Sequence, residues 1–212
     1  NNHIVDLILS AYNNESKVLD FGAGCGILAK IFRKKTNYSP TCIEIDEYFK
    51  SILIKIGFNV VDSIEKTKGQ YDFIYSSNVL EHIYDDVKSL KKLKSKLSKN
   101  GTLVLYLPAF QILFSDLDRK VGHFRRYSKR KIIKITSDAG LEIDKIFYVD
   151  SIGFFCSFII KILGWNTEYG IGSKNSLKFY DKLIFPVSRS LDFLGFKYFC
   201  GKNIFVSLKK LQ

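Results

Sequence analysis

The sequence predicts an α/β fold that is built on a parallel β-sheet. Apolar runs of strand length alternate with amphipathic helical patterns through most of the chain, which is typical of folds where a helix connects neighbouring parallel strands. A glycine-rich segment stands directly between the first apolar run and the first helical pattern, as in nucleotide-binding sheets. Nearly half of the 212 residues are hydrophobic (46%), so the chain is long and apolar enough to bury a substantial core.

The elements follow in order along the chain. A helix begins at Ile27, directly after the glycines, and the clearest helix is Asp85–Ser98, where apolar residues recur on one face and lysines cover the others. We expect Asn100-Gly101 to end this helix, and a further helix over Lys129–Ala139. Seven segments have the composition of strands: Lys17–Asp20, Thr41–Ile45, Phe58–Val61, Phe73–Ser76, Thr102–Leu107, Glu142–Val149 and Asn203–Leu208.

The net charge and the number of cysteines limit which partners and which cellular location we expect for the protein. Lys and Arg outnumber Asp and Glu by 33 to 21, and the net charge of +12 fits either a solvated lysine-rich surface or an anionic partner such as a phospholipid, a phosphorylated sugar or nucleic acid. The four cysteines lie far apart, which favours reduced thiols in a cytoplasmic protein. No apolar run reaches the ~18 residues of a membrane span, and no signal-peptide pattern begins the chain. Because the chain contains no Met, we do not expect its first residue to be the native start.

A glycine loop follows the first strand, where residues 18–26 read V-L-D-F-G-A-G-C-G. Glycines at alternate positions allow a tight turn and let bare backbone approach a ligand, and the N-terminus of the next helix attracts anions. The spacing D-x-G-x-G-x-G differs from the dinucleotide pattern G-x-G-x-x-G. It resembles the cofactor loop of class I S-adenosylmethionine-dependent methyltransferases. This resemblance implies that the cofactor is bound by Asp20, Gly22, Ala23, Gly24 and Gly26.

Two further strand ends carry carboxylates that suit a nucleoside. Glu44 can accept hydrogen bonds from both hydroxyls of a ribose, with capping of the next helix as the alternative role. The E-I-D pattern of residues 44–46 resembles the same site in several methyltransferase families, which favours Glu44 and Ile45 for the cofactor and Asp46 for the cap. Asp62 follows the third strand and is expected either to meet the amine of adenine or to be an exposed turn residue.

Residues 71–83 read Y-D-F-I-Y-S-S-N-V-L-E-H-I and resemble the fourth strand and following loop of small-molecule methyltransferases. Residues 99–105 resemble the hairpin into their fifth strand. The matching segments stand in the right order from residue 18 to 107. The resemblance therefore implies a Rossmann-like, doubly wound, mostly parallel sheet of seven strands, with an antiparallel last strand and a helical insertion before it, in one domain over 1–212. It also implies that Asn78 lines the methionine end of the cofactor.

The loop after the fifth strand reads G-H-F-R-R-Y-S over residues 122–128. With the preceding P-A and D, it resembles the P-A…D…G-H-x-R-R-Y-[ST] signature of a bacterial and archaeal methyltransferase subgroup that often appears with surface-polysaccharide or lipid-modifying enzymes. His123 can exchange a proton near neutral pH, and Arg125 and Arg126 can hold a carboxylate or phosphate through paired hydrogen bonds. The alternatives are structural: a hydrogen bond by which His123 fixes the loop, and ion pairs of the arginines with Asp116 or Asp118.

These resemblances imply methyl transfer from S-adenosylmethionine to an O or N atom of an anionic small-molecule, sugar or lipid-linked acceptor, without a metal. His123 and His82 are the candidate bases, and the acceptor would be bound by Glu81, Arg125, Arg126 and Tyr127. An RNA methyltransferase and a non-catalytic cofactor-binding module stay open as other functions. Nucleic acid is disfavoured as a partner, because neither N-P-P-Y nor a Pro-Cys nucleophile pair is present. The sequence leaves the oligomeric state open.

The segment 151–201 differs from the rest, because it is rich in Phe, Ile, Leu and Tyr and has few acids. Two helices are expected, Phe154–Leu163 and Leu177–Leu194, the second interrupted by Pro186. From residue 151 to 212, nine Lys or Arg stand against three Asp or Glu. Apolar bulk with cations suits a helix on anionic lipid, so we expect an acceptor-side cap that touches the inner face of a membrane. Completion of the core or of a dimer interface is the alternative. The expectation rests on Phe154, Phe155, Phe158, Ile159, Ile162, Trp165, Phe179, Leu183, Phe185, Phe193, Phe196, Tyr198 and Phe199.

Overall fold

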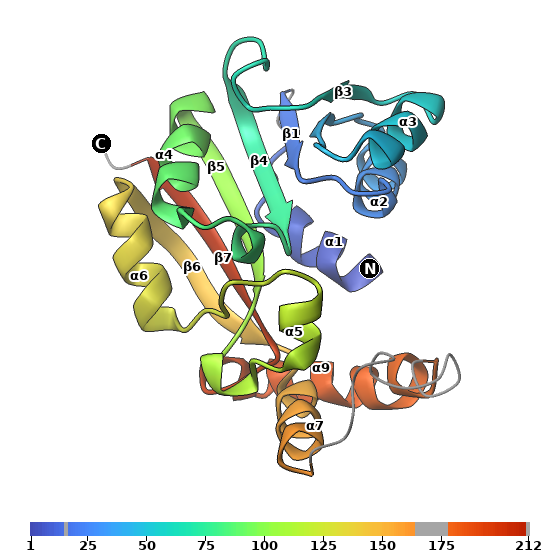
Figure 1. Cartoon of the computed structure of the whole chain (residues 1–212), viewed down its shortest axis with the longest axis vertical. Helices are drawn as coiled ribbons and strands as arrows, with labels where there is room; N and C mark the ends of the chain where they lie inside the picture. The colour runs from blue at the N-terminus through green and yellow to red at the C-terminus, as the bar shows by residue number, and fades with distance from the viewer. Residues whose placement is uncertain (15–16, 164–177, 211–212) are drawn as a thin grey trace.

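A computed structural model, which describes residues 1–14, 17–163 and 178–210, contains a seven-stranded sheet in the order β3-β2-β1-β4-β5-β7-β6 (Figure 1). Neighbouring strands pair in parallel except for β7, which is antiparallel to both β5 and β6. The predicted fold class is therefore confirmed. The strands are β1 (Val18–Phe21), β2 (Thr41–Ile43), β3 (Asn59–Val61), β4 (Tyr71–Ser77), β5 (Leu97–Pro108), β6 (Leu141–Val149) and β7 (Asn203–Lys210).

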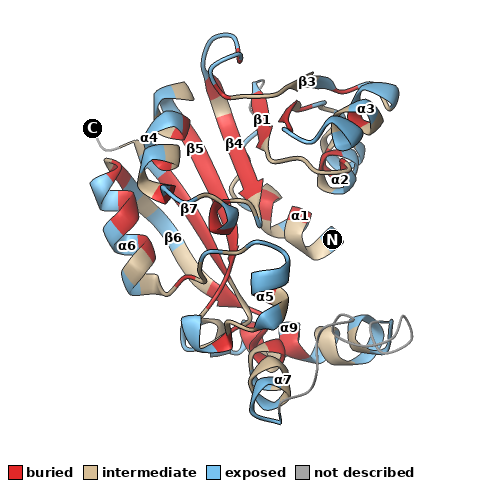
Figure 2. Ribbon diagram, in the orientation of Figure 1, coloured by how far each residue is buried: buried red, intermediate tan, exposed pale blue. Residues whose placement is uncertain are grey.

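Helices cover both faces of the sheet (Figure 1). Because side chains alternate along a strand, Phe73 and Tyr75 of β4 pack against α1 and α2, while Ile74 packs among residues of α4 and α6 on the other face. Leu53 of α3 packs with Ala29 of α2 beside β2. Figure 2 shows the buried residues concentrated in the central strands and on the inner sides of these helices. The helices are α1 (Asn2–Leu9), α2 (Ile27–Thr36), α3 (Glu47–Lys55), α4 (Asp86–Lys96) and α6 (Lys129–Asp138).

Two elements differ from the sequence-based expectation. The helix expected to end at Asn100-Gly101 ends at Lys96, because Leu97 already pairs with Tyr71 of β4 and residues 98–101 form an irregularity within β5. Helix α1, which the sequence analysis did not assign, places Val5 and Ile8 against the sheet. The apolar spacing of three residues between Val5 and Ile8 was a readable signal for it.

The described parts of segment 151–201, residues 151–163 and 178–201, lie beyond the carboxyl ends of the central strands, at the bottom of Figure 1. They contain α7 (Ser151–Ile162), a π-helical turn η3 (Tyr180–Ile184), α9 (Phe185–Phe193) and a 3₁₀ turn η4 (Phe196–Tyr198). Helix α7 begins three residues before the expected start at Phe154, and Pro186 is the second residue of α9. Leu177 and Trp165 lie outside the described residues.

A buried polar network holds these helices to the sheet. Asp150 follows β6, and its carboxylate accepts hydrogen bonds from the Gly153 amide (3.0 Å) and the Ser188 hydroxyl (2.8 Å). The Asp192 carboxylate of α9 accepts hydrogen bonds from the backbone amides of Asp150 (2.8 Å) and Ser151 (3.2 Å). Buried carboxylates that are hydrogen-bonded in this way fix the orientation of the elements they join. Within the described part of the chain, no helix is long and apolar enough to cross a membrane.

Candidate active site

The three glycines of the loop after β1 serve different purposes. All three have positive φ, +80° at Gly22, +54° at Gly24 and +78° at Gly26. A Cβ at Gly22 would overlap the side chain of Val79, and one at Gly26 would lie 2.6 Å from Leu53 Cδ2. A Cβ at Gly24 would have no protein atom within 4 Å. Packing therefore requires the two outer glycines, while Gly24 faces open space in which a ligand can contact the backbone.

Glu44 is held by backbone amides at the end of β2. Its Oε2 accepts a hydrogen bond from the Gly24 amide (2.7 Å), and its Oε1 accepts bonds from the amides of Ile45 (2.8 Å) and Asp46 (2.9 Å). Asp46 caps α3 by accepting a hydrogen bond from the Phe49 amide at 3.0 Å, which confirms the expected cap. Glu44 thus joins the glycine loop to β2, and its carboxylate oxygens keep lone pairs for a further donor.

A cavity of about 180 Å³ lies beside the ends of β1, β2 and β3. Phe21, Ile43, Ile45 and Asp62 are among the residues that line it. The Ile45 side chain is 78% exposed, so an apolar surface is free to stack on a planar ring. The Asp62 carboxylate forms an ion pair with Lys66 at 2.7 Å, and that hydrogen bond lowers the pKa of Asp62. Three of the residues predicted to bind the nucleoside, Glu44, Ile45 and Asp62, therefore gather at one end of the glycine loop.

Asp20 is buried below the glycine loop, where the Tyr75 hydroxyl favours its ionised form, but its Oδ2 has no partner in hydrogen-bond geometry. Burial raises the pKa of Asp20 to about 7. A buried carboxylate oxygen without a partner is costly unless a ligand supplies one. The open side of Gly24, the cavity beside Asp62 and this unpaired oxygen together fit a cationic nucleoside.

Asn78 and Val79 connect the end of β4 to the 3₁₀ turn that carries Glu81 and His82. Asn78 is exposed to solvent, and its backbone adopts the left-handed conformation (φ +54°), which Asn tolerates better than most residues. Its backbone N–H donates to Tyr106 O at 2.8 Å. Val79 packs on Gly22, and the 3₁₀ turn η1 (Leu80–His82) begins directly after it. Glu81 and His82 therefore lie in the 3₁₀ turn that directly follows the residue packed against the glycine loop.

Glu81, His82 and His123 meet in one cluster. One ligand-type atom from each residue lies within 4.8 Å of the others, and the two imidazole rings pack edge to face with centroids 4.5 Å apart. Glu81 is fully buried, His123 is partly buried and His82 is exposed. Burial raises the pKa of Glu81 to about 8, and burial together with His123 lowers the pKa of His82. The structure thus brings together three of the residues predicted for catalysis and acceptor binding.

Asp118 is the centre of the loop that carries His123. It belongs to the short helix α5 (Asp116–Lys120), which follows the 3₁₀ turn η2 (Gln111–Leu113). Its carboxylate contacts His123 Nδ1 at 2.8 Å and accepts two hydrogen bonds from Arg126, both at 3.0 Å. It also accepts bonds from the backbone amide and the hydroxyl of Ser115. Burial opposes ionisation, but these bonds, those of Arg126 first, lower the pKa of Asp118. The Phe124 amide donates to Glu81 O at 2.8 Å, so the loop is joined directly to η1.

The sequence analysis treated Asp118 only as an alternative partner of the arginines. Its central role could have been found from S-x-x-D at residues 115–118, because this spacing is that of a capping box. The partner of Arg125 was missed altogether, since Asp86 lies 39 residues earlier in the sequence.

The other predicted acceptor residues have protein partners. Arg125 Nη1 lies 3.1 Å from Asp86 Oδ2 and donates to Ile83 O at 2.9 Å. Arg126 bonds to Asp118 through Nε and Nη2, and only its buried Nη1 lacks a partner. Tyr127 is fully buried and donates to Leu80 O at 3.1 Å. Burial and this bond place the Tyr127 side chain in support of η1, and its contact with an acceptor stays a prediction.

Comparison with known proteins identifies the class. The family model described as a methyltransferase domain matches residues 2–146, which is more than half of the chain. Among curated proteins, none matches the sequence. A structure of a SAM-dependent methyltransferase from Thermotoga maritima has a TM-score of 0.63 and 15% identity over 97% of this chain and 86% of that chain. An O-methyltransferase of Brevibacillus brevis in complex with S-adenosyl-L-homocysteine has a TM-score of 0.60 and 17% identity over 99% and 71% of the two chains.

The mitomycin 7-O-methyltransferase MmcR has a TM-score of 0.60 and 12% identity over 99% of this chain, which spans about half (53%) of that protein. At these identities the structures establish the fold. The chain belongs to the methyltransferase domain family. It is an S-adenosylmethionine-dependent methyltransferase of class I, and S-adenosylmethionine is its cofactor.

Proposed function

We propose that this protein transfers the methyl group of S-adenosylmethionine to an O or N atom of an anionic, lipid-linked acceptor, and that it does so at an anionic membrane surface. The observation that carries this proposal is an exposed apolar surface on segment 151–201, at the acceptor end of the sheet. Of the thirteen residues expected to form it, nine are exposed, Phe154, Phe158 and Phe185 are half-buried, and Trp165 lies outside the described residues.

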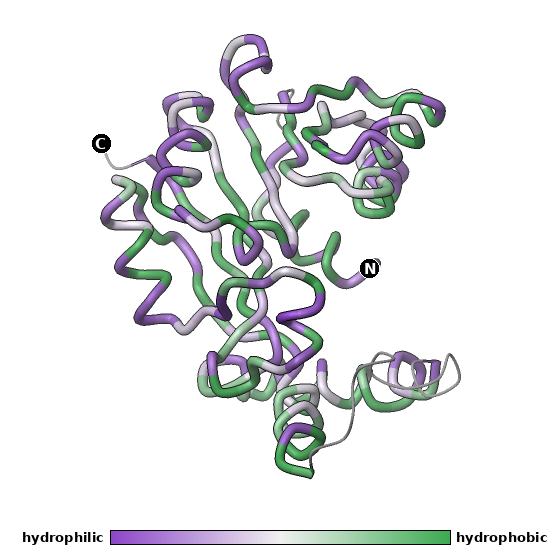
Figure 3. Tube along the Cα trace, viewed as in Figure 1, coloured by the Kyte–Doolittle hydropathy of each residue, from purple (hydrophilic) through white to green (hydrophobic). Residues whose placement is uncertain are grey.

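Twelve apolar residues in the described parts of this segment are exposed. Figure 3 shows hydrophobic residues along much of α7, and hydrophobic and hydrophilic residues mixed in the turn before α9. Exposed apolar residues gathered in one segment of a soluble protein favour contact with a partner or a membrane. The twelve residues of this apolar surface, all at least 45% exposed, are Phe155, Ile159, Ile162, Leu163, Phe179, Leu183, Val187, Phe193, Leu194, Phe196, Tyr198 and Phe199.

Cations interrupt the apolar surface, and this favours anionic lipid over a second apolar protein face. Lys161, Lys178, Lys182, Arg189 and Lys197 lie on the same helices and turns. A basic residue near an anionic membrane contributes about 1 kcal/mol to binding. A dimer interface would bury these charges without a counterpart, whereas a headgroup layer supplies anions to each of them.

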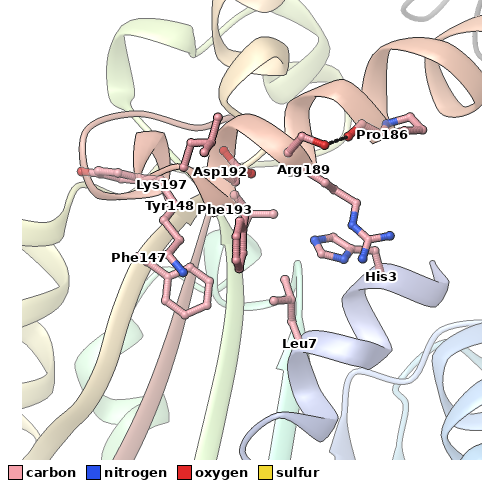
Figure 4. Close-up of a pocket in the computed structure, with 12 residues that line it drawn as sticks. His3, Leu7, Phe147, Tyr148, Pro186, Arg189, Asp192, Phe193 and Lys197 are labelled. Carbon is pink, nitrogen blue, oxygen red and sulfur yellow. Dashed lines mark hydrogen bonds between the residues drawn. The ribbon is translucent and has the colours of Figure 1, made fainter.

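A second cavity, of about 600 Å³, lies between α1, the end of β6 and α9 (Figure 4). Leu7, Phe147 and Phe193 give it apolar walls, and Arg189 and Lys197 also line it. Apolar walls beside two cations suit a chain that bears an anionic group. We propose that the apolar tail of the acceptor lies here, next to the apolar surface.

The reacting end of the acceptor meets the cluster of Glu81, His82 and His123. When bound, the cofactor supplies a methyl group that is already activated by its sulfonium, so the residues mainly orient the acceptor, exclude water and receive its proton. His123 is oriented for this by Asp118, and Nη1 of Arg126 is buried beside them without a partner. Methyl transfer then forms a bond from the acceptor O or N to carbon, while the carbon–sulfur bond breaks and its electrons stay on sulfur.

Sedimentation with vesicles tests the membrane proposal. The protein is expected to sediment with phosphatidylglycerol vesicles at low salt and to stay in solution with phosphatidylcholine vesicles. The double variant Phe193→Glu with Phe199→Glu should lose binding, because both side chains are at least 80% exposed on the apolar surface. Ile54→Glu is the matched control, since Ile54 is 60% exposed on α3, outside that surface. Binding that survives the double variant would remove this surface from the proposal.

Labelled cofactor tests the acceptor class. With methyl-labelled S-adenosylmethionine and a lipid extract that contains polyprenyl-phosphate sugars, label should move to the organic phase. Label that instead enters RNA, with steeply salt-dependent RNA binding, would establish the RNA alternative. Cofactor binding without transfer to any acceptor, unaffected by removal of both His82 and His123, would establish the non-catalytic alternative.

A further inference from the structure

The cluster of Glu81, His82 and His123 contains an unsatisfied carboxylate. Glu81 is fully buried, and neither Oε1 nor Oε2 has a hydrogen-bond partner. Arg126 does not meet this need, because its Nε and Nη2 are committed to Asp118 and its Nη1 has no partner. A buried carboxylate normally has partners for both oxygens, so Glu81 points to a ligand that the cluster is built to hold.

In contrast to the metal-free site that the sequence resemblance implies, we propose that Glu81, His82 and His123 bind a divalent transition-metal ion, Zn²⁺ in the first instance. One ligand-type atom of each residue lies within 4.8 Å of the others, and His123 Nε2 lies 3.9 Å from Glu81 Oε1. Ligand bonds of about 2.0–2.2 Å to a shared ion leave such atoms about 3–4 Å apart, so small side-chain rotations close the site. Two imidazoles and a carboxylate suit Zn²⁺, Co²⁺ or Mn²⁺, whereas Mg²⁺ and Ca²⁺ prefer oxygen ligands throughout.

The contacts around the cluster orient its ligands. Asp118 Oδ1 lies 2.8 Å from His123 Nδ1, which directs the other ring nitrogen, Nε2, toward Glu81. A carboxylate behind a metal-binding histidine is the usual arrangement in metal sites, where it fixes the tautomer and the ring orientation. The charge of Arg126 acts on Glu81 and favours its ionised form, but Arg126 gives both of its side-chain hydrogen bonds to Asp118 and none to Glu81.

Three protein ligands leave coordination positions open on the side of His82, which is exposed. An acceptor hydroxyl bound at an open position loses its proton to solvent more easily, because the ion stabilises the oxygen anion. That oxygen then attacks the methyl carbon, the carbon–sulfur bond breaks and its electron pair stays on sulfur. In this arrangement, the ion replaces the histidines as the group that activates the acceptor, whereas the cofactor and the acceptor class stay as in the proposed function. The inference concerns the site of the proposed function and rests on it.

Calorimetric titration of the chelator-treated full chain with Zn²⁺ tests the site. One ion per chain is expected, and Co²⁺ should give visible d–d absorption without the intense near-ultraviolet band of thiolate ligands. Glu81→Gln and His82→Gln should each weaken Zn²⁺ binding by at least tenfold, and Asp118→Asn by about 10–100-fold. His3→Gln is the matched control, because His3 is the third histidine of the chain and lies against Phe185 at the far side of α1.

The proposal is overturned if the wild-type chain binds no Zn²⁺ at micromolar concentration, or if Glu81→Gln and His82→Gln bind it as tightly as the wild type while retaining native circular dichroism. Titration with S-adenosylhomocysteine, in the presence of chelator, separates this outcome from failure of the proposed function. Cofactor binding without Zn²⁺ binding removes the metal site alone. Zn²⁺ binding without cofactor binding removes the proposed function alone.

Discussion

The cofactor loop and the acceptor-side loop of this methyltransferase are built in opposite ways. At the cofactor loop, Gly24 faces empty space and Ile45 is 78% exposed, while the buried Asp20 has an oxygen without a partner. At the acceptor-side loop, residues 111–127, most charged groups are held by ion pairs, within the loop or, for Arg125, with Asp86. The Asp118 carboxylate contacts three other residues of this loop: Ser115, His123 and Arg126.

The difference between the two loops shows that a charged residue in a recognisable sequence pattern need not bind a ligand. A cofactor that contacts the protein backbone needs space without side chains beside that backbone, and glycines provide this space because they have no Cβ. An acceptor that must be positioned for in-line attack requires a rigid loop, and buried ion pairs supply that rigidity. On the acceptor side, the atoms left for a ligand are those without partners, on Glu81 and at Nη1 of Arg126.

The largest expected effect comes from removing the centre of the acceptor-side loop. Asp118→Ala would leave Arg126 buried without its carboxylate, and breaking a buried ion pair costs about 3–5 kcal/mol of unfolding free energy. Urea denaturation measures this change. Asp116→Ala is the control, because its carboxylate is 82% exposed and pairs only with Arg119 on the surface. Equal denaturation midpoints for the two variants would contradict the view that this loop is held by its buried charges.

The glycines of the cofactor loop should separate folding from binding. Gly22→Ala combines left-handed strain with overlap of Val79 and should lower the free energy of unfolding by about 2–4 kcal/mol. Gly24→Ala meets no protein atom and should cost about 1 kcal/mol, yet it should weaken S-adenosylmethionine binding more than tenfold because its methyl fills the cofactor's space. Calorimetry and urea denaturation of both variants check the pair. Wild-type affinity in Gly24→Ala would show that the cofactor does not approach this glycine.

The sequence predicted the place of the glycine loop in the fold better than the contacts within the acceptor-side loop, for the same physical reason. A glycine loop between a strand and a helix is a local feature, so its spacing alone located Gly22, Gly24 and Glu44 correctly in the fold. The partners of the acceptor-side residues are set by chain segments far apart in sequence. Asp86 pairs with Arg125, and Tyr127 donates to Leu80 O, across about 40 residues. No spacing rule shows such pairs, and so the burial of Tyr127 and the proximity of His82 to His123 required the structure.

Glu44 and Asp46, the two carboxylates that follow β2, test whether binding and folding are separate functions at the cofactor loop. Glu44→Ala should weaken S-adenosylmethionine binding by about 1–3 kcal/mol, because charged hydrogen bonds to the ribose are lost. It should also lower the free energy of unfolding, since the amides of Gly24, Ile45 and Asp46 lose their acceptor. Asp46→Ala should instead remove the cap of α3 and lower the free energy of unfolding by about 1 kcal/mol, with little effect on affinity. Calorimetry and denaturation on both variants separate the roles. The reverse outcome, a binding defect in Asp46→Ala alone, would shift the cofactor contact by two residues.

The smallest expected effect is a pH dependence of cofactor affinity that originates at Asp20. Burial raises the pKa of Asp20 to about 7, so in the free protein this carboxyl holds a proton below that pH. The sulfonium and ammonium charges of S-adenosylmethionine favour the ionised form, and binding below pH 7 must therefore release the proton. Affinity should fall as pH decreases from 7, by at most about tenfold per pH unit, and should be level above pH 7. Calorimetry at pH 6 in two buffers of different ionisation enthalpy measures the released proton directly. Asp20→Asn, which has nothing to release, should bind more weakly with a flat profile, and a wild-type profile that is equally flat would mean that the cofactor's charge does not reach Asp20.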